Sequence, residues 1–363
     1  MNLEAIRHRW LSQIRAAVRE QAPLLALTAV IVLGGFVAEA VTGLAGQMNH
    51  LWYRPSYVHF IRILAMPLPI AFLWGRLKVT DGDGVWLQGA PGWKAAWRRF
   101  LEVYLNPRVV SAAVLAGLMV AANINVFGAW KLAIPKLRPF DWDPRLAELD
   151  RLLHFGRHPW ELLRPALENS LATNILDFSY YTWLPLVAIV CAWQAWSPRR
   201  ELRLRFFLTF VAVWIVLGDI AAVAFSSAGP PYWDQVVGGV NPYRGLFDHL
   251  SAVAGQMPLG TPIVQNALWA RYTSAVQTPY TGISAMPSIH VAMPVLYALV
   301  GWRTWKPLGV AFAAYGVLIL VGSVHLGWHY AIDGYASILG VLVLWWVAGK
   351  FTSKRFPARS IVA

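Results

Sequence analysis

Two apolar stretches near the carboxyl end of the chain decide its fold class. They are residues 307–325, PLGVAFAAYGVLILVGSVH, and residues 330–349, YAIDGYASILGVLVLWWVAG. Each is long enough for a helix that crosses a bilayer, which takes roughly 20 residues. The sequence therefore predicts an all-α fold, a polytopic membrane helix bundle. Working outward toward the amino end, the same pattern predicts further spans at residues 22–44, 58–75, 107–129, 174–197, 205–226 and 288–303, which makes about eight transmembrane helices.

The composition fits a protein whose solvent is lipid. Of the 363 residues, 57% are hydrophobic and 13% are charged, whereas soluble domains carry about 25% charged residues. The 20 tryptophans agree with this, because Trp prefers the headgroup level of a membrane. Residues 86–104 combine tryptophans with Arg98 and Arg99. That mixture predicts an amphipathic helix at the membrane surface rather than another span.

Lys and Arg are distributed unequally between the two sides of the predicted bundle. With eight spans, both tails and the even-numbered connections share one side and carry 20 of these residues, against 10 on the other side. The positive-inside rule then predicts a multi-pass protein with both termini in the cytoplasm. The net charge of +13 is explained by this bias and by attraction to anionic lipid. It therefore requires no nucleic-acid partner.

The predicted outer loop at residues 130–173 is unusually basic for its side. Its acids balance most of the charge over residues 143–168, which favours a solvated, partly helical surface segment. Lys131, Lys136 and Arg138 differ, because they follow a span directly and no acid precedes Asp141. Fixed positive charge at the mouth of a helix bundle is costly without a nearby anion. These residues therefore indicate an anionic ligand, and phosphate is a natural candidate.

Reactive side chains from two other connections reach the same predicted outer face. His290 lies in residues 286–290, MPSIH, while His329 and Asp333 lie in residues 323–333, SVHLGWHYAID. His329 and Asp333 are four residues apart and share a helix face. A carboxylate bonded to one imidazole nitrogen leaves the other free as a base or nucleophile. His290 would then act as the general acid for a leaving oxygen.

These three segments resemble the motifs of the type 2 phosphatidic acid phosphatase (PAP2) superfamily, over about residues 107–349. The first motif matches Lys131, six residues, then Arg138 and a proline; the second resembles residues 287–290, PSIH; the third matches residues 329–333, HYAID. The resemblance implies a six-helix core and a phosphohistidine formed on His329 without a metal. It also implies that Asp333 orients His329 and His290 protonates the leaving group. Lys131, Arg138 and Ser288 would hold the phosphate oxygens.

Two departures from the family pattern are informative. The third motif normally opens with Ser-Arg, where this chain has Gly322 and Ser323, and the glycine of the second motif is replaced by Ile289. Both changes are similar to the inositol phosphorylceramide synthase branch, which transfers a phospho-headgroup between lipids. These residues do not decide between hydrolysis, with water as the acceptor, and transfer to an alcohol. Arg244 and Arg271 are the basic residues of the loop at 227–287 and are candidate headgroup contacts that replace the lost arginine.

Two other classes of protein compete with this hypothesis. His325, His329 and Asp333 recur at four-residue spacing, and such a set can bind iron or zinc. The basic pair Lys131 and Arg138 argues against a cation site, so no metal and no cofactor are expected. A non-enzymatic transporter or scaffold with an interfacial polar cluster is the second alternative. Repeated halves would favour a transporter, and the sequence has none.

The sequence thus predicts a membrane lipid phosphatase or phosphotransferase in three parts. Residues 1–106 hold the tail, two spans and the amphipathic segment, residues 107–349 form the catalytic membrane domain, and residues 350–363 form a basic cytoplasmic tail. The expected partners are a phospholipid or lipid phosphate substrate and the bilayer itself. The active site is expected on the extracytoplasmic side. The lipid, the acceptor and the oligomeric state are left open.

Overall fold

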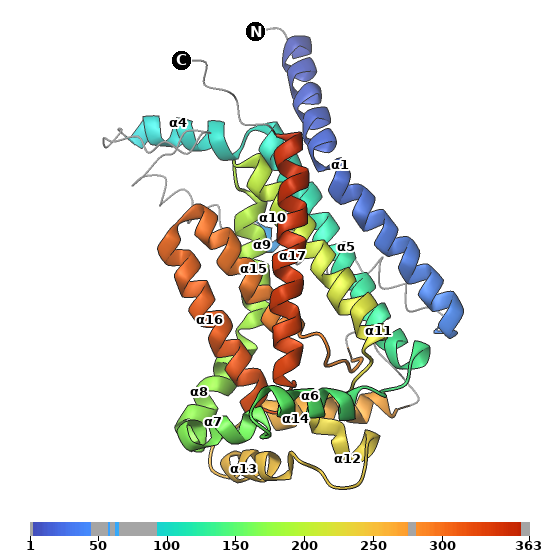
Figure 1. Cartoon of the computed structure of the whole chain (residues 1–363). Coiled ribbons are helices and arrows are strands. Elements are labelled where there is room, and N and C mark those ends of the chain that lie inside the picture. The colour runs from blue at the N-terminus through green and yellow to red at the C-terminus, as the bar shows by residue number, and fades with distance from the viewer. Residues whose placement is uncertain (1–2, 45–56, 59–61, 65–92, 275–280, 357–363) are drawn as a thin grey trace.

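The computed structural model of the chain is all-α over the part that it describes. It describes residues 3–44, 57–58, 62–64, 93–274 and 281–356, and these form helices and no strand. The long helices run side by side as a bundle (Figure 1). They are α1 (Leu3–Thr42), α5 (Pro107–Leu137), α8 (Ser170–Tyr181), α9 (Trp183–Ala195), α10 (Arg200–Val213) with the π-helix η2 (Trp214–Ala221) and α11 (Ala222–Ala224), α15 (Ile289–Thr304), α16 (Lys306–His325) and α17 (Ala331–Arg355).

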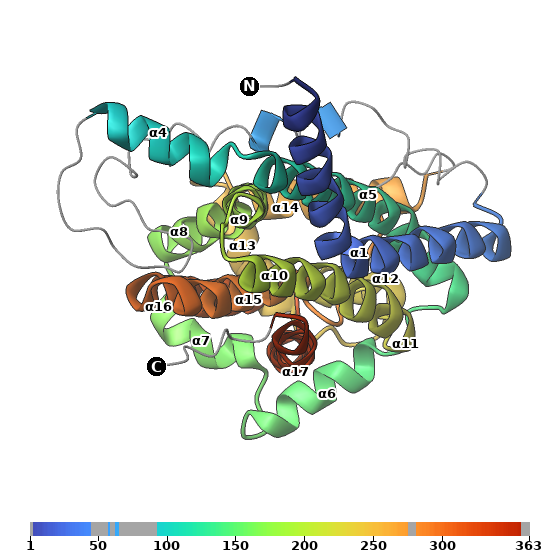
Figure 2. The same ribbon diagram turned by 90° about the horizontal axis from the view of Figure 1, so that it is seen from above.

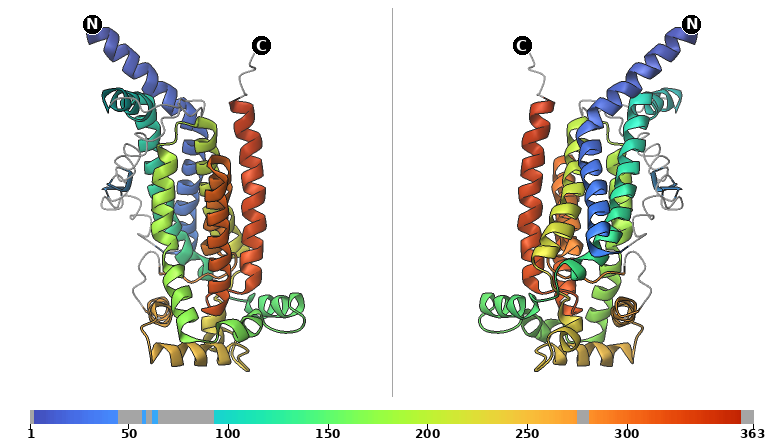
Figure 3. Two further views of the ribbon diagram at one scale, coloured as in Figure 1. Left: turned by 90° about the vertical axis from the view of Figure 1, so that its left-hand side faces the viewer. Right: turned by 90° about the vertical axis from the view of Figure 1, so that its right-hand side faces the viewer.

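Shorter helices cover one end of this bundle. Figures 1 and 3 show them at the end opposite the start of α1 and the last turn of α17. They are α6 (Asp143–Leu153), α7 (Pro159–Leu167), the 3-10 helix η3 (Pro230–Tyr232), α12 (Trp233–Val236), α13 (Arg244–Ala254) and α14 (Gly260–Tyr272). The loops predicted at 130–173 and 227–287 therefore fold as helical caps on the bundle. One further helix, α4 (Trp93–Tyr104), lies across the other end and occupies the described part of the predicted amphipathic segment.

The predicted membrane class is confirmed. Within the described residues, 6 helical stretches are long and apolar enough to cross a bilayer: Trp10–Thr42, Pro107–Leu137, Ser170–Ala195, Arg200–Ala224, Lys306–His325 and Ala331–Arg355. The protein is therefore an integral membrane protein. The predicted span at 288–303 is present as α15, whose 16 residues are short for a full crossing. The predicted span at 58–75 lies almost wholly outside the described residues.

One predicted boundary changes where the polar cluster begins. The third span was expected to end at residue 129, because Lys131 and Lys136 interrupt the apolar pattern. Instead α5 continues to Leu137, and Arg138 is its C-cap residue. Lys131 therefore projects from the helix within the bundle rather than from a loop. Asn106 starts the same helix, since its side chain accepts a hydrogen bond of 3.0 Å from the Val109 amide.

Close helix packing brings the second and third predicted motifs together. Helices α15 and α16 form a tight antiparallel hairpin, visible end-on in Figure 2 beside α17. A side chain at Gly309 would bring its Cβ within 2.6 Å of the Trp302 amide nitrogen, so only glycine permits this approach. Small residues serve this purpose in membrane helices, where the hydrophobic effect does not drive helix association. The hairpin thus places the start of α15 next to the end of α16.

Candidate functional site

His329 and Asp333 form a buried pair at the start of α17. His329 Nδ1 lies 3.2 Å from Asp333 Oδ2, and the same oxygen accepts a hydrogen bond of 3.1 Å from the Tyr330 amide. This second bond caps the helix, so the local fold that starts α17 also fixes the carboxylate. The side chain of Asp333 is 0% exposed and that of His329 is 5% exposed. The pair is held rigidly before any ligand arrives.

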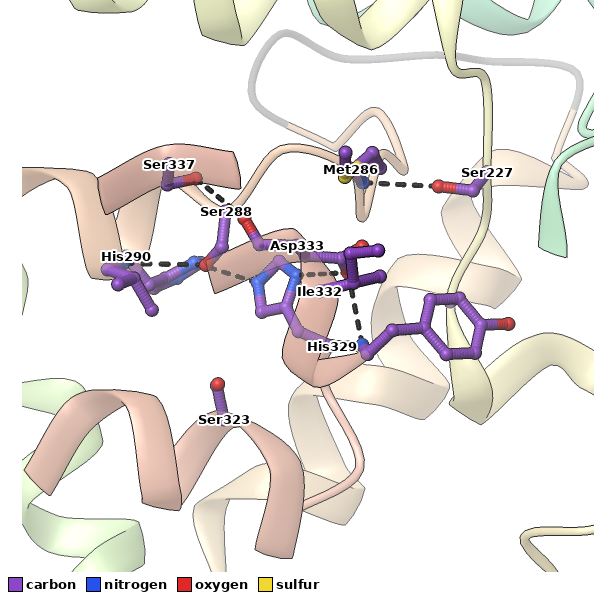
Figure 4. A network of polar contacts seen from close by, with 12 residues as sticks. Ser227, Met286, Ser288, His290, Ser323, His329, Ile332, Asp333 and Ser337 are labelled. Atoms are coloured by element: carbon purple, nitrogen blue, oxygen red, sulfur yellow. Dashed lines mark hydrogen bonds and ion pairs between the residues drawn. The ribbon is translucent and has the colours of Figure 1, made fainter. Parts of the chain in front are cut away.

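His290 completes a chain of three side chains. His329 Nε2 lies 3.3 Å from His290 Nδ1, and Figure 4 shows His329 between His290 and Asp333. Because His329 Nδ1 faces an acceptor-only carboxylate, we assign its proton to Nδ1 and leave Nε2 as an acceptor. His290 Nδ1 must then carry the proton of the contact between the rings. The arrangement therefore holds an unprotonated imidazole nitrogen directly against a protonated one.

Ser288 fixes the helix that carries His290. Its hydroxyl caps α15 by accepting from the Val291 amide, and its own amide donates a hydrogen bond of 3.2 Å to the Asp333 carbonyl. The preceding segment is tied to the loop before η3, since the Met286 amide donates to Ser227 Oγ at 3.1 Å (Figure 4). The predicted second motif is therefore joined through its backbone to the third. Ser288 is fully buried.

Lys131 reaches this cluster from α5. It is partly buried, and its charge acts electrostatically on both His290 and His329. The segment before the second motif runs directly against this helix, because a Cβ at Gly282 would collide with the Lys131 carbonyl. In the part of the chain that the structure describes, no ion pair with an acid involves Lys131. The cluster therefore has a positive charge beside it that no described acid neutralises.

The electrostatic setting keeps His329 neutral. Burial, and to a smaller extent the Lys131 cation, lower the pKa of His329 from its ordinary 6.5 to about 3. Desolvation disfavours a charged imidazole, and a like charge nearby has the same effect. A neutral imidazole with a free Nε2 is the form that can attack an electrophile.

The predicted phosphate ligand Arg138 and the predicted headgroup contacts Arg244 and Arg271 make no described contact with the imidazoles. Arg138 forms a salt bridge of 3.0 Å with Asp141 and donates a hydrogen bond of 2.6 Å to the Ala224 carbonyl. Arg244, the first residue of α13, and Arg271, in the last turn of α14, have exposed side chains. A role for these three arginines requires movement on ligand binding and stays a proposal. The structure brings together Lys131, Ser288, His290, His329 and Asp333 without it.

Aromatic residues that the sequence reasoning missed surround His290. The Tyr180 ring stacks on its imidazole at a centroid distance of 4.8 Å and 20°, and Trp183 meets it edge-on at 4.5 Å. Tyr180 also lies parallel to Trp328 at 6.1 Å. The Tyr180 hydroxyl is buried and has no hydrogen-bond partner among the described residues. Tyr180 and Trp183 belong to a span of ordinary apolar appearance, so no local signal marked them.

Two acids that were predicted to lie on a solvated surface are buried instead. Asp143 and Asp150 of α6 are each 1% exposed, and this corrects the prediction for these two positions. Asp150 accepts hydrogen bonds of 2.7 and 2.8 Å from the Ala331 and Ile332 amides, so it caps α17 from outside. Asp143 accepts a bond of 2.8 Å from the Tyr330 hydroxyl. Their spacing of seven puts both on one helix face, a signal that could have identified them.

Burial raises the pKa of both acids, and that of Asp150 reaches about 7. Each carboxylate also accepts hydrogen bonds from two backbone amides. These bonds favour the charged carboxylate and so oppose the rise in its pKa. Because these amides include those of Ala331 and Ile332, α6 holds the segment between His329 and Asp333 in place. The outer helices thus contribute to the geometry of the polar cluster.

The position of the missing motif arginine is occupied by a small side chain. Ser323 is fully buried and its hydroxyl donates a hydrogen bond of 2.8 Å to the Leu320 carbonyl. Figure 4 shows it pointing from α16 toward the side of the cluster where the two imidazoles lie. At the preceding position, a Cβ added to Gly322 would lie in ordinary contact with Leu176 at 3.7 Å and Tyr180 at 3.8 Å. No cation enters the cluster from α16.

The rival metal set does not assemble. His325 Nε2 lies 2.9 Å from the Thr173 hydroxyl on α8, which also contacts His249 Nε2 at 3.0 Å. His325 is thus engaged with α8 and not with His329 and Asp333. Among the described residues, no group of three His, Cys, Asp or Glu side chains is placed to hold a metal ion. The chemistry that the cluster itself supports is nucleophilic attack by an imidazole, with a second imidazole as proton donor.

Comparison with known families agrees with this geometry. The family model of the PAP2 superfamily matches residues 144–347, which is more than half of the chain. The chain therefore belongs to the PAP2 superfamily, and this membership supports a phosphatase-type, lipid-related enzyme. The match includes His290, His329 and Asp333 and begins after Lys131 and Arg138. No curated protein and no solved structure matches the chain.

Proposed function

We propose that the protein cleaves a phosphoester of a membrane phospholipid through a phosphohistidine on His329. The observation that carries the proposal is the contact chain from Asp333 Oδ2 through His329 to His290 Nδ1, with distances of 3.2 and 3.3 Å. A carboxylate that orients one imidazole, next to a second imidazole that holds a proton, is the set needed to split a phosphoester in two steps.

The first step forms the covalent intermediate. The lone pair of His329 Nε2 attacks phosphorus, a P–N bond forms and the bond from phosphorus to the leaving oxygen breaks. That oxygen takes the proton of His290 Nδ1, with His290 doubly protonated in the complex with the phosphate anion, so that a neutral imidazole remains. The positive charge that develops on the His329 ring is stabilised by Asp333 at Nδ1. The phosphoryl group has to enter between the two rings, so binding separates the contact of 3.3 Å between His329 Nε2 and His290 Nδ1.

The second step releases the product. The neutral His290 imidazole then takes a proton from the acceptor, which is water or a lipid alcohol. The acceptor oxygen attacks phosphorus, the P–N bond breaks, and His329 and His290 regain their starting protonation. The same residues therefore serve hydrolysis and transfer, and access of the acceptor decides between them.

The charge of the site favours a phosphodiester over a phosphomonoester. Lys131 is the cation that acts on both imidazoles, whereas Arg138 is bonded to Asp141 and Ser323 stands in the position of a family arginine. One cation matches the single negative charge of a diester better than the double charge of a monoester. This supports transfer of a phospho-headgroup to a lipid alcohol, as in the inositol phosphorylceramide synthase branch. Residues 107–349 would form the catalytic membrane domain.

The site is proposed to face the extracytoplasmic side of the membrane. The motif segments lie toward the end of the bundle opposite the start of α1 and the end of α17 (Figure 1). The basic residues of the tails favour the cytoplasm for those ends. The substrate would therefore come from the outer leaflet, with no nucleic acid and no cofactor involved.

The test is turnover of labelled phospholipids by purified protein in lipid nanodiscs. Phosphatidic acid and phosphodiester lipids are supplied with and without a ceramide or diacylglycerol acceptor. We expect a diester substrate and a new phospholipid when the acceptor is present; free phosphate as the sole product would indicate a phosphatase. His329→Gln is expected to abolish turnover, and His325→Gln, the matched control, to have a smaller effect. Full activity in folded His329→Gln would overturn the mechanism.

A further inference from the structure

An apolar groove crosses the membrane-spanning part of the bundle between α15, α16 and α17. Its volume is about 270 Å³, and the surface that lines it is almost entirely apolar. Figure 2 shows the three helices side by side at one edge of the bundle. The residues that define the groove are Val291, Ala298 and Trp302 of α15, Ala313 and Gly316 of α16, and Ile338 of α17.

The groove exists because small residues line the α16 wall. Ala313 and Gly316 face it with little or no side chain, and a Cβ at Gly316 would still have ordinary contact with Pro294 Cβ at 3.5 Å. Its open side faces lipid, since Trp302 is 53% exposed and Val317 is 61% exposed. A hydrocarbon chain can therefore enter sideways from the bilayer, whereas a polar ligand would find no partner.

One end of the groove adjoins the polar cluster. Val291, which lines the groove, directly follows His290 in the chain. Gly334, which directly follows Asp333, packs so closely on the groove residue Leu320 that any Cβ there would collide with it. The same Cβ would lie 3.4 Å from Val291. The head of the groove is thus built from the residues next to His290 and Asp333.

The groove is long enough to hold an acyl chain lengthwise. From Val291 to Trp302 the lining advances eleven positions along α15, which is roughly 16 Å at 1.5 Å per residue. An extended acyl chain whose phosphate sits at His290 and His329 would follow α15 along the groove as far as Trp302.

We propose that this groove holds one acyl chain of the lipid whose phosphoester reacts at His329. This inference rests on the proposed function, and it adds the place in the bundle where an acyl chain of the substrate lies. An acyl chain that moves from the bilayer into the groove exchanges one hydrocarbon environment for another. Its burial therefore contributes little to the affinity of the protein for the lipid. The groove instead positions the headgroup, and its effect is expected in the rate at which a bound lipid reacts.

The first experiment detects the chain without using activity. Phosphatidylglycerol with a diazirine on one acyl chain is incorporated into nanodiscs with the full-length protein, irradiated, and the adducts are mapped by peptide mass spectrometry. We expect adducts concentrated on the groove walls of α15, α16 and α17. Ala313→Phe, which fills the groove, is expected to remove them, while Ala314→Phe, an exposed neighbour outside the groove, retains them. Adducts spread evenly over the lipid-facing helices would overturn the proposal.

The second experiment separates failure of the groove from failure of the proposed function. Turnover is compared for a long-chain substrate and for a short-chain, water-soluble version of it. Ala313→Phe is expected to lower kcat/KM about tenfold to hundredfold for the long chain, with the short-chain rate unchanged and Ala314→Phe normal for both. Equal loss for both chains, or a change in oligomeric mass that shows a second copy seated there, would reject the acyl-chain site. Absence of turnover in the unmodified protein, with localised adducts, would reject the proposed reaction alone.

Discussion

Buried charged side chains are paired at one end of the bundle and unpaired with an acid at the other, among the residues that the structure describes. At the end near the start of α1, Arg203 is 1% exposed and forms an ion pair with Glu20, which also bonds Arg108 at 3.2 Å. At the opposite end, Lys131 acts on two imidazoles and forms no ion pair among the described residues. One end holds a buried ion pair that a second arginine joins, and the other holds a cation without an ion-pair partner among the described residues, beside the buried group of His290, His329 and Asp333.

This difference separates a structural role from a ligand-binding role. A buried ion pair is strongly destabilised when one partner is removed, because the other charge is left uncompensated. An unpaired cation imposes a desolvation cost on the folded protein that an arriving anion can offset. Residues of the first kind are therefore expected to control stability, and Lys131 is expected to control activity.

Among the variants that test this comparison, the largest effect is expected for Lys131→Met. Loss of the cation should lower kcat/KM by about 100-fold or more, because a charge-assisted contact to the phosphoryl oxygens disappears. The melting temperature should stay equal or rise, since an unpaired charge has been removed from the bundle. Lys131→Arg is the control for charge and should retain part of the activity. A large fall in melting temperature without a fall in specific activity would reverse the comparison.

Arg203→Met should show the opposite pattern. It leaves Glu20 with the partly exposed Arg108 as its charged partner, and breaking a buried pair costs about 3–5 kcal/mol. Denaturant or thermal unfolding in detergent measures the loss. The turnover of the protein that remains folded should be close to normal. Retained stability would show that the ion pair is dispensable.

The pH dependence of stability tests the state of His329. Its pKa in the fold is about 3, against an ordinary 6.5. Below pH 6.5 the His329 imidazole is therefore protonated in the unfolded chain but not in the folded protein. Its contribution to the free energy of unfolding is fully present above pH 6.5 and is lost as the pH falls toward 3. Between pH 7 and pH 5 this contributes about 2 kcal/mol, at about 1.4 kcal/mol per unit. His329→Gln should lose that part of the slope; identical slopes would contradict a neutral, buried His329.

Asp150→Ala is expected to have the smallest effect on stability. It should lower kcat, whereas the same substitution at Asp177 should not. Two amides at the start of α17 lose their acceptor, at a cost of about 1–2 kcal/mol. Asp177 offers a matched control, because it accepts bonds of 2.8 and 3.0 Å from the Gly260 and Thr261 amides at the start of α14. Both variants should be destabilised similarly, with kcat lowered only in Asp150→Ala. Equal kcat values would show that Asp150 is a cap without a positioning role.

The sequence was sufficient for features with a local signature. The apolar blocks predicted the membrane bundle, and the spacing of His329 and Asp333 predicted the contact of 3.2 Å that the structure contains. The convergence of His290 on this pair followed from the order of the spans. In each case the prediction rests on residues within one helix, or on the rule that successive connections between spans lie on alternate sides of the membrane.

Features that depend on long-range packing could not be predicted in the same way. Asp150 caps a helix 181 positions away, and an acid in a polar loop is ordinarily solvated. Tyr180 and Trp183 adjoin His290 only because of how α8 and α9 pack on α15. Arg138 shows the converse, since a motif match gives no information on the nearby Asp141 that engages its side chain.

The most direct test of the account is capture of the covalent intermediate. Protein is mixed with a phospholipid substrate labelled in the phosphate, quenched within one turnover in alkali, which preserves phosphohistidine, and mapped by peptide mass spectrometry. A phosphoryl or phospho-headgroup adduct is expected on His329, and it should be absent in His329→Gln. Turnover of the unmodified protein with the adduct on another residue, or with no adduct under conditions that preserve phosphohistidine, would contradict it.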